Sequence, residues 1–156
     1  MINMIIAIDA YGGIGKNGNL PWRIPEDLKA FKDLTMDGIL FVGKKTAKTL
    51  PPLKGREIIV LSRNDFPTFH DIISNKAWEN RAKWIIGGSV IYQAALDLEI
   101  VDRVYLTTID KKYDADTYFP SESLQKFQNE NWAMNNETVL RSHDPYVTMQ
   151  EWNKLK

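Results

Sequence analysis

The chain has 156 residues, with 20 basic and 20 acidic side chains, so its formal net charge is zero. That balance argues against nucleic acid or an anionic membrane as the main partner, because both attract basic surfaces. Cysteine is absent, which excludes disulfides and thiolate catalysis and fits a reducing cytoplasm. The two histidines, His70 and His143, have no ligand spacing around them, so we predict no metal site. The length is that of one domain, residues 1–156.

Apolar runs of strand length recur along the chain. Runs without polar alternation are typical of parallel strands that helices cover on both faces. The runs are Met4–Ile8, Ile39–Val42, Ile58–Leu61, Lys83–Ile86 and Arg103–Ile109. The first run is too short for the core of a signal peptide and lacks a basic start, so we interpret it as a buried strand. No run approaches the length of a transmembrane helix, so we predict no membrane segment.

Helical patterns fall between these runs. They cover Pro25–Thr35, Lys44–Leu50, Asp71–Asn80 and Val90–Leu98. The alternation predicts an α/β sheet with right-handed crossovers. The tail differs, because two strand-like runs follow one another without a helix: Asn131–Glu137, and a run from Val139 or Tyr146 to Trp152. Joined by the polar turn Arg141–Pro145, they predict an antiparallel hairpin at the edge of the sheet.

One acidic residue lies on the apolar face of the first predicted helix. Asp27, Phe31 and Leu34 are spaced i, i+4 and i+7, so they share a face. Ionising an acid beside such neighbours is costly unless something pairs with it, which makes Asp27 a candidate proton handler or ligand partner. The ordinary structural explanation stays open, because Pro25 suits the first helical position and acids in a first turn interact favourably with the helix dipole.

Two predicted strands end in glycine turns that lead into helices. Gly43 precedes Lys44 and Lys45, and the pair Gly87-Gly88 precedes the last predicted helix. A helix N-terminus offers free N–H groups, and glycine lets a phosphate approach closely, so two such turns can hold the ends of one dinucleotide. Each turn alone is also common in α/β folds. Neither matches G-x-G-x-x-G or the P-loop, which disfavours a standard Rossmann site and an ATPase.

Further short motifs are spread over nearly the whole chain. They are Ala7 in the first strand, Ile14-Gly15, Leu20-Pro21-Trp22, Pro25-x-Asp27-Leu28-x-x-Phe31-Lys32, Gly43-x-x-Thr46, Leu53-x-Gly55-Arg56, Val60-Leu61-Ser62, Ile86-Gly87-Gly88, Tyr92, Tyr105-Leu106-Thr107 and Asp116-Thr117-x-Phe119-Pro120. In order and spacing these motifs resemble the dihydrofolate reductase family.

The resemblance implies a fold and a reaction. The implied fold is α/β, with a mostly parallel eight-stranded central sheet, four flanking helices and an antiparallel C-terminal strand. The implied reaction is the NADPH-dependent reduction of 7,8-dihydrofolate to 5,6,7,8-tetrahydrofolate, by hydride transfer to C6 and protonation of N5. This reaction serves one-carbon metabolism and thymidylate synthesis, and enzymes of the family are antifolate targets. We expect a cytoplasmic monomer that binds no nucleic acid and no membrane.

The resemblance also implies roles in catalysis. Asp27 matches the single active-site carboxylate of the family, which grips the 2-amino group and N3 of the pterin and favours protonation of the ring through water. Trp22 and Thr107 match residues that hold this water and orient the carboxylate. Arg56 matches the residue that forks onto the α-carboxylate of the glutamate tail, and Lys32 would assist it.

The implied substrate-binding set combines apolar walls, backbone carbonyls and these two cations. It is Ile5, Ala7, Leu28, Phe31, Lys32, Leu50, Leu53, Arg56, Ile86 and Tyr92. Ile5 and Ile86 match positions whose carbonyls meet the pterin. Without the resemblance, Leu28 and Phe31 have an ordinary explanation as core residues, and the two cations as solvated surface.

The implied cofactor-binding set follows the glycine turns. It is Ala7, Ile14, Gly15, Leu20, Gly43, Lys44, Lys45, Thr46, Leu61, Ser62, Arg63, Gly87, Gly88, Ser89 and Val90. The adenosine 2′-phosphate is expected at Lys44, Ser62 and Arg63. The pyrophosphate is expected at Lys45, Thr46 and the Gly87–Val90 turn, and the nicotinamide at Ala7, Ile14 and Leu20. The family's paired glycines imply a cis Gly87-Gly88 peptide. The Ala10–Ile24 loop would close over the nicotinamide, steadied by the loop that holds Asp116.

The chain departs from the family pattern in places that bear on affinity and on inhibitor response. Lys44 stands where arginine is frequent, Ala47 where a large aromatic residue is usual, and Val90 where bacterial members have a polar or basic residue. The Thr49–Lys54 segment is one residue shorter than in some relatives.

Two alternative functions stay open at this point. One is another pyridine-nucleotide reductase of the same fold, such as the pyrimidine reductase of riboflavin synthesis, which shares the cofactor turns but lacks Pro21-Trp22 and the Asp27 helix. The other is a catalytically idle binding or structural relative, which loss of Asp27, Arg56 or the glycine pair would indicate. All of these residues are present.

Overall fold

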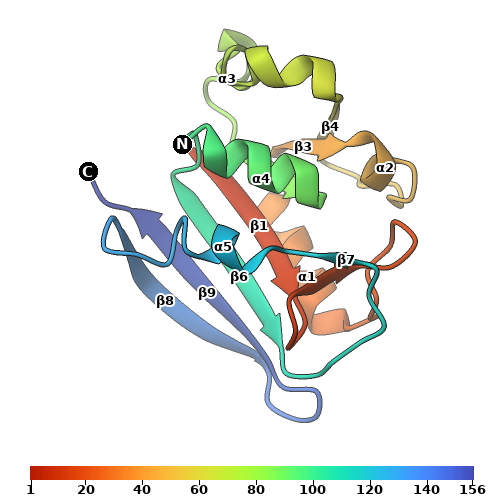
Figure 1. Ribbon diagram of the computed structural model, residues 1–156. Helices are drawn as coiled ribbons and strands as arrows, with labels where there is room; N and C mark the ends of the chain where they lie inside the picture. The colour runs from red at the N-terminus through yellow and green to blue at the C-terminus, as the bar shows by residue number, and fades with distance from the viewer.

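The protein is built around a central β-sheet. The computed structural model describes residues 1–156, apart from the side chains of Phe66 and Pro67. Within this described part, seven strands lie in the order β4-β3-β5-β1-β6-β9-β8 (Figure 1). Their bounds are β1 (Ile2–Ile8), β3 (Ile39–Gly43), β4 (Glu57–Leu61), β5 (Lys83–Gly87), β6 (Arg103–Ile109), β8 (Trp132–Arg141) and β9 (Val147–Lys154). Only β9 runs against the other strands of this sheet, since it pairs antiparallel with both β6 and β8.

Helices and a small second sheet surround the central one. The α-helices are α1 (Pro25–Thr35), α2 (Lys44–Ala47), α3 (Phe69–Ile73), α4 (Ser89–Asp97) and α5 (Ser121–Leu124), with 3₁₀ turns η1 (Arg63–Thr68) and η2 (Lys76–Trp78). The second sheet pairs β2 (Gly13–Gly15) antiparallel with β7 (Thr117–Tyr118). In Figure 1, α4 lies in front of the central sheet and α1 lies behind it.

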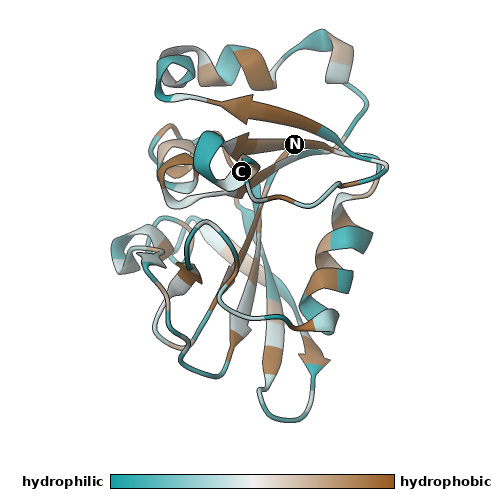
Figure 2. Cartoon of the chain, turned by 90° about the vertical axis from the view of Figure 1, so that its right-hand side faces the viewer, coloured by the Kyte–Doolittle hydropathy of each residue, from teal (hydrophilic) through white to brown (hydrophobic). Residues whose placement is uncertain are grey.

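The two faces of the sheet carry separate apolar clusters. Met4 and Ile6 of β1 belong to the same buried cluster as Ile91 of α4. Ile5, between them in sequence, belongs to the opposite cluster, against which Phe31 of α1 packs. Because helices cover both faces, the inner parallel strands β1, β3 and β5 are apolar over most of their length, in line with the brown strands at the top of Figure 2.

The predicted α/β class with an antiparallel C-terminal strand is confirmed. The ranges Pro25–Thr35 and Arg103–Ile109 are observed residue for residue as α1 and β6. The described residues form a seven-stranded and a two-stranded sheet, where one eight-stranded sheet was predicted. They form five α-helical segments, where four helices were predicted. The difference lies in short elements of two to four residues, namely β2, β7 and α5.

Several predicted boundaries were wrong, and β8 runs to Arg141 instead of ending at Glu137 as predicted. The helix predicted at Asp71–Asn80 is broken, because the Asn75 side chain accepts a hydrogen bond from the Ala77 N–H at 2.9 Å and starts the separate turn η2. The helix predicted at Lys44–Leu50 ends at Ala47, after which the backbone tightens into i to i+3 bonds ahead of two prolines. The last strand begins at Val147, so a start near Tyr146 is right and a start at Val139 is wrong.

The central strand β3 gives a direct test of this core. Phe41 is fully buried and its ring meets that of Trp78 edge-on, with centroids 5.7 Å apart. We expect Phe41→Ala to lower the free energy of unfolding by about 3–5 kcal/mol in equilibrium urea denaturation, because it leaves a cavity. The half-exposed Val139 of β8 supplies the control, and Val139→Ala is expected to change stability by less than about 0.5 kcal/mol. Equal effects of the two variants would contradict the assignment of Phe41 to the core.

Candidate active site

The carboxyl ends of β3, β4 and β5 bring the predicted cofactor turns together. β3 is parallel to both neighbours, with Gly43 opposite Leu61 of β4 and Val42 opposite Gly87 of β5. The turns that follow these strands therefore lie side by side at one edge of the sheet. In open α/β sheets this edge is where ligands bind.

The glycine turns leave room that a side chain would fill. A Cβ at Gly43 would lie 3.1 Å from the Ile91 side chain and 3.7 Å from the Gly88 nitrogen, and a Cβ at Gly88 would lie 3.0 Å from the Thr46 hydroxyl. Gly88 is also the N-cap of α4 and has no capping side chain, so N–H groups of the first turn stay available. The Gly87-Gly88 peptide is cis, which confirms that prediction. The cradle suits a phosphate-bearing ligand.

Basic and polar side chains surround this cradle. Lys44 and Lys45 are exposed at the start of α2, and Arg63 is exposed just after β4. Ser62 is engaged within its own loop, because its N–H and its hydroxyl lie 2.7 and 3.2 Å from the Asp65 carboxylate. The three predicted cations are thus free to meet a ligand, whereas Ser62 would first have to release Asp65.

The remaining predicted cofactor residues lie near the same edge. Ile14 and Gly15 belong to β2, Ala7 to β1 and Leu61 to β4, while Ser89 and Val90 open α4. The side chains of Leu20 and Val90 are 43% and 48% exposed, so both present apolar surface to solvent.

Asp9 fixes the root of the Ala10–Ile24 loop. Its carboxylate accepts hydrogen bonds from the N–H groups of Tyr11 and Gly13, both at 2.8 Å, and from that of Tyr113 at 3.0 Å. Asp9 was missed in the sequence, although an aspartate between a buried strand and a Gly-Gly pair is typical of a turn that bonds its own backbone.

The tip of this loop is held from two sides. The Asp116 carboxylate accepts a hydrogen bond from the Asn17 N–H at 2.9 Å. This bond is the main reason why the pKa of Asp116 lies below its ordinary value. On the other side the Thr49 hydroxyl donates to the Gly18 carbonyl. The predicted contact between the Asp116 loop and the Ala10–Ile24 loop is therefore present, and the bridge from Thr49 near α2 had no signal in the sequence.

Asp27 is a buried carboxyl group on α1. It is 7% exposed, and among the described residues the one side chain that hydrogen-bonds to it is Trp22, whose Nε1–H donates at 3.2 Å. Burial raises the pKa of Asp27, and the Trp22 hydrogen bond only partly offsets this. Trp22 is itself fixed by Tyr113, since their ring centroids are 5.5 Å apart. The chain thus holds Asp27 poised to bind a proton or a cationic partner.

Tyr92 links Asp27 to the backbone of two strands. Its hydroxyl lies 2.8 Å from the carbonyl oxygens of both Ile5 and Ile86, and it has a single proton to donate. Burial raises the pKa of Tyr92, and the negative charge of Asp27 raises it further. Because Tyr92 has one proton for two carbonyl acceptors, it donates to only one of them at a time.

The other residues of the predicted substrate set differ in their surroundings. Thr107 is buried on β6 directly beside Ala7 of β1. Phe31, Leu53 and Ile86 pack around the buried residues of this face. Leu50 is half-buried, and Leu28 and Lys32 are exposed on α1.

Arg56 stands just outside this wall. Its Nε donates to the Lys54 carbonyl at 3.1 Å and its Nη1 to the Thr35 hydroxyl at 3.4 Å.

A long-range ion pair anchors the first turn of α1. The Nη1 of Arg141 on β8 lies 3.2 Å from both carboxylate oxygens of Glu26, the neighbour of Asp27. The Nη2 of Arg141 also donates to the Asp144 carbonyl, which ties α1 to the C-terminal hairpin. The partners are 115 residues apart, so sequence reasoning had no basis for pairing them.

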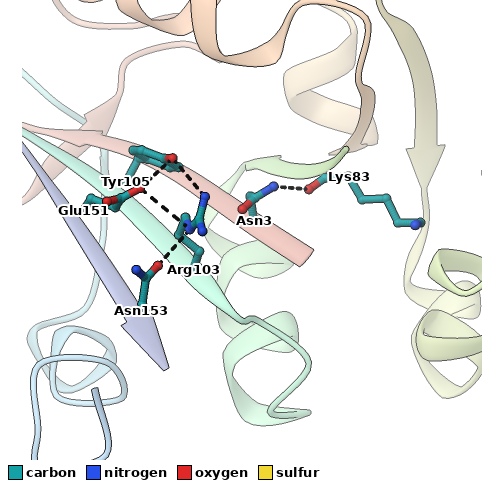
Figure 3. A network of polar contacts seen from close by, with 6 residues as sticks. All are labelled: Asn3, Lys83, Arg103, Tyr105, Glu151 and Asn153. Carbon is teal, nitrogen blue, oxygen red and sulfur yellow. Dashed lines mark hydrogen bonds and ion pairs between the residues drawn. The ribbon is translucent and has the colours of Figure 1, made fainter. Parts of the chain in front are cut away.

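A polar network crosses β6 and β9 near their ends (Figure 3). The Tyr105 hydroxyl donates to Glu151 at 2.8 Å, and the Arg103 Nε donates to Asn153 at 2.8 Å. Burial, followed by the bond to Glu151, raises the pKa of Tyr105. The Tyr105 ring meets that of Trp84, with centroids 5.5 Å apart, so the network borders the apolar cluster beneath α1.

Among the described residues, no group of three or more His, Asp or Glu side chains is placed to hold a metal ion. Nor does any helix of the described chain have the length and apolar character needed to cross a membrane.

Comparisons with known proteins point to one family. The family model for dihydrofolate reductase matches residues 1–152. A putative dihydrofolate reductase of Caenorhabditis elegans is 31% identical over 99% of this chain and 97% of its own length. The dihydrofolate reductase of Mycobacterium leprae is 39% identical over 70% of this chain and 73% of its own length. Among solved structures, a dihydrofolate reductase from Enterococcus faecalis, complexed with NADP(H) and RAB-propyl, matches with a TM-score of 0.79 and 25% identity, covering 100% of this chain and 97% of that one.

The raised pKa of Asp27 predicts a dependence of stability on pH. Between the ordinary pKa of aspartate and the raised one, the folded chain binds more protons than the unfolded chain, so the free energy of unfolding falls as pH rises through this window. Asp27→Asn removes this penalty and keeps an acceptor for Trp22. We expect the variant to be more stable than the parent in urea denaturation at neutral pH, and to lose that advantage below about pH 3. An Asn variant no more stable than the parent at neutral pH would contradict this.

The contact between Asp116 and Asn17 predicts the mobility of the loop. Asp116→Ala should speed hydrogen exchange at the Asn17 amide, because the acceptor of that N–H is lost. Asp114→Ala is the matched control, since Asp114 lies two residues away and makes an exposed ion pair with Lys16. If both variants change exchange equally, Asp116 is not what holds the loop.

Proposed function

The chain belongs to the dihydrofolate reductase family, and from that premise we propose that it reduces 7,8-dihydrofolate to tetrahydrofolate with NADPH as hydride donor. The observation that carries the proposal is the buried Asp27 carboxyl group. Within the described chain it accepts a hydrogen bond from Trp22 but has no cationic partner. A ligand that brings its own donors and positive charge completes this site.

The edge of a pterin has the matching chemistry. Its 2-amino group and N3 present two donors side by side, which a carboxylate can accept as a bidentate pair. Burial raises the pKa of Asp27 in the free protein, and these donors would lower it again when they bind. The carbonyls of Ile5 and Ile86 meet at the Tyr92 hydroxyl, which has one proton for the two of them. Together these groups support binding of the ring in a fixed orientation.

Protonation of N5 then follows from the charge that Asp27 places beside the ring. The carboxylate meets the N3 edge, so it acts on N5 by favouring the protonated ring, with a water molecule as the carrier of the proton. Trp22 supports this role, because its N–H orients the carboxylate and its ring packs against Tyr113. The Ala10–Ile24 loop, held at Asn17 and Gly18, limits access of bulk water to the reacting atoms.

The residues at the carboxyl edge fit a dinucleotide phosphate. The space above Gly43 and Gly88, and the uncapped start of α4, admit a pyrophosphate, while Lys44 and Arg63 offer charge for a 2′-phosphate. NADPH bound there supplies the hydride that is transferred to C6. Lys44 makes point-charge contacts where an arginine would fork, so Arg63 becomes the more directional of the two.

The same proposal covers organisation and location. The family match spans residues 1–152, which supports one domain, residues 1–156, and we propose that it acts as a monomer. The absence of cysteine is consistent with a reducing cytoplasm. The charge balance supports small molecules, rather than nucleic acid or a membrane, as binding partners.

The proposed function is tested by the loss of NADPH absorbance when dihydrofolate is added. We expect turnover by the parent, and a fall in kcat of roughly 10²-fold or more near neutral pH for Asp27→Asn, because the pterin loses its counter-charge. NADPH binding, followed by fluorescence, should be unchanged in that variant. Asp33→Asn is the control, since Asp33 lies on the same helix but is exposed and pairs with Lys29. Full activity in Asp27→Asn, or no turnover by the parent despite NADPH binding, would refute the proposal.

A further inference from the structure

One acidic side chain lies among the predicted cofactor residues that follow β4. The Asp65 carboxylate accepts hydrogen bonds through Oδ2 from the Ser62 N–H at 2.7 Å and from the Ser62 hydroxyl at 3.2 Å. In return, the Asp65 N–H donates to the Ser62 carbonyl at 3.0 Å. These bonds close a compact turn directly after β4 and hold the half-buried Asp65 in place. The turn therefore presents a fixed negative charge at the cofactor edge of the sheet.

No cation of the described chain pairs with this charge. Asp65 forms no ion pair among the described residues, and neither do Lys44 and Arg63, the two cations predicted to meet an adenosine 2′-phosphate. Arg63 is close to Asp65 in the sequence, but its side chain is exposed and leaves the carboxylate unpaired. A ligand that binds at this edge therefore meets charges of both signs.

Asp65 opposes the 2′-phosphate that distinguishes NADPH from NADH. A phosphate that binds at Ser62 has to displace the Asp65 carboxylate from the Ser62 N–H and hydroxyl, which it already satisfies. The displaced carboxylate stays near the phosphate, and two negative charges at short range repel each other. Lys44 and Arg63 still attract the phosphate, but Asp65 offsets part of that attraction.

The second oxygen of Asp65 suits a ribose without the phosphate. Only Oδ2 is bonded to Ser62, and among the described residues nothing donates to Oδ1. NADH has a free 2′-hydroxyl in place of the phosphate. A carboxylate that accepts a hydrogen bond from this hydroxyl is a common way in which dinucleotide sites select NAD over NADP. Asp65 has an oxygen left for such a bond without releasing Ser62.

We propose that Asp65 is a specificity-determining residue of the cofactor site, which narrows the preference for NADPH and lets the chain use NADH as a second hydride donor. The inference rests on the proposed function. The nicotinamide is the same in both cofactors, so a hydride passes from its C4 to C6 of dihydrofolate and a proton passes from water to N5. The products are tetrahydrofolate and NAD⁺.

Binding of the two cofactors tests this without turnover. NADPH and NADH are titrated into the full chain, with energy transfer from tryptophan to the reduced nicotinamide as the readout. Asp65→Asn keeps an acceptor for Ser62 and removes the charge. We expect it to raise the ratio of NADPH affinity to NADH affinity roughly threefold to tenfold, because it removes one like-charge contact and weakens one competing hydrogen bond. In a separate assay, the parent should oxidise NADH when dihydrofolate is added.

A matched control separates this role from a general change in charge. Asp71 is exposed on α3 and, within the described chain, makes no hydrogen bond to Ser62, so Asp71→Asn should leave the ratio at the parent value. An Asp65→Asn variant that changes both affinities equally would show only a structural effect on the turn, and it overturns the proposal. So does a parent that oxidises NADPH but not NADH. If neither cofactor binds the parent, the proposed function fails and this inference fails with it.

Discussion

The cost of burying one carboxyl group organises this site. Asp27 is nearly inaccessible, and within the described chain only the Trp22 N–H bonds to it, so water and protein together leave its charge poorly compensated. Such a group lowers the stability of the free protein, a common sign that function rather than stability accounts for a residue. Glu26, one position earlier, shows the contrast, because Arg141 compensates its charge at the surface of the same turn. Two adjacent acids on α1 thus have opposite environments.

The parallel sheet supplies what Asp27 needs around it. Because β1, β3, β4, β5 and β6 all end at one edge, their turns converge without any direct sequence relation. At this edge the carbonyls of Ile5 and Ile86 meet the Tyr92 hydroxyl. Across the edge, Gly43 and Gly88 keep the backbone bare enough for phosphate. A hydride donor and an acceptor ring can therefore lie side by side over the same strands.

Sequence reasoning succeeded where the determinants are local. The i, i+4, i+7 spacing at Asp27 placed it on the buried face of α1, and glycine after a strand marked the turns correctly. It failed at Asp71–Asn80, where one hydrogen bond from the Ala77 N–H to Asn75 outweighs helical propensity. Contacts between distant residues had no local signal at all, as at Arg141 with Glu26. The spacing also left Asp27 ambiguous between a dipole partner and a ligand partner, and its burial with one neutral donor is what favours the second.

The most direct measurement is the titration of the Asp27 carboxyl carbon by NMR, with and without a bound folate. We expect a pKa above the ordinary value for aspartate in the free protein, since burial disfavours the charge. We expect that pKa to fall when the pterin binds, because two donors then stabilise the carboxylate. An ordinary pKa in the free protein that does not change on binding would contradict both the free-energy cost of burying the Asp27 charge and its contact with the pterin.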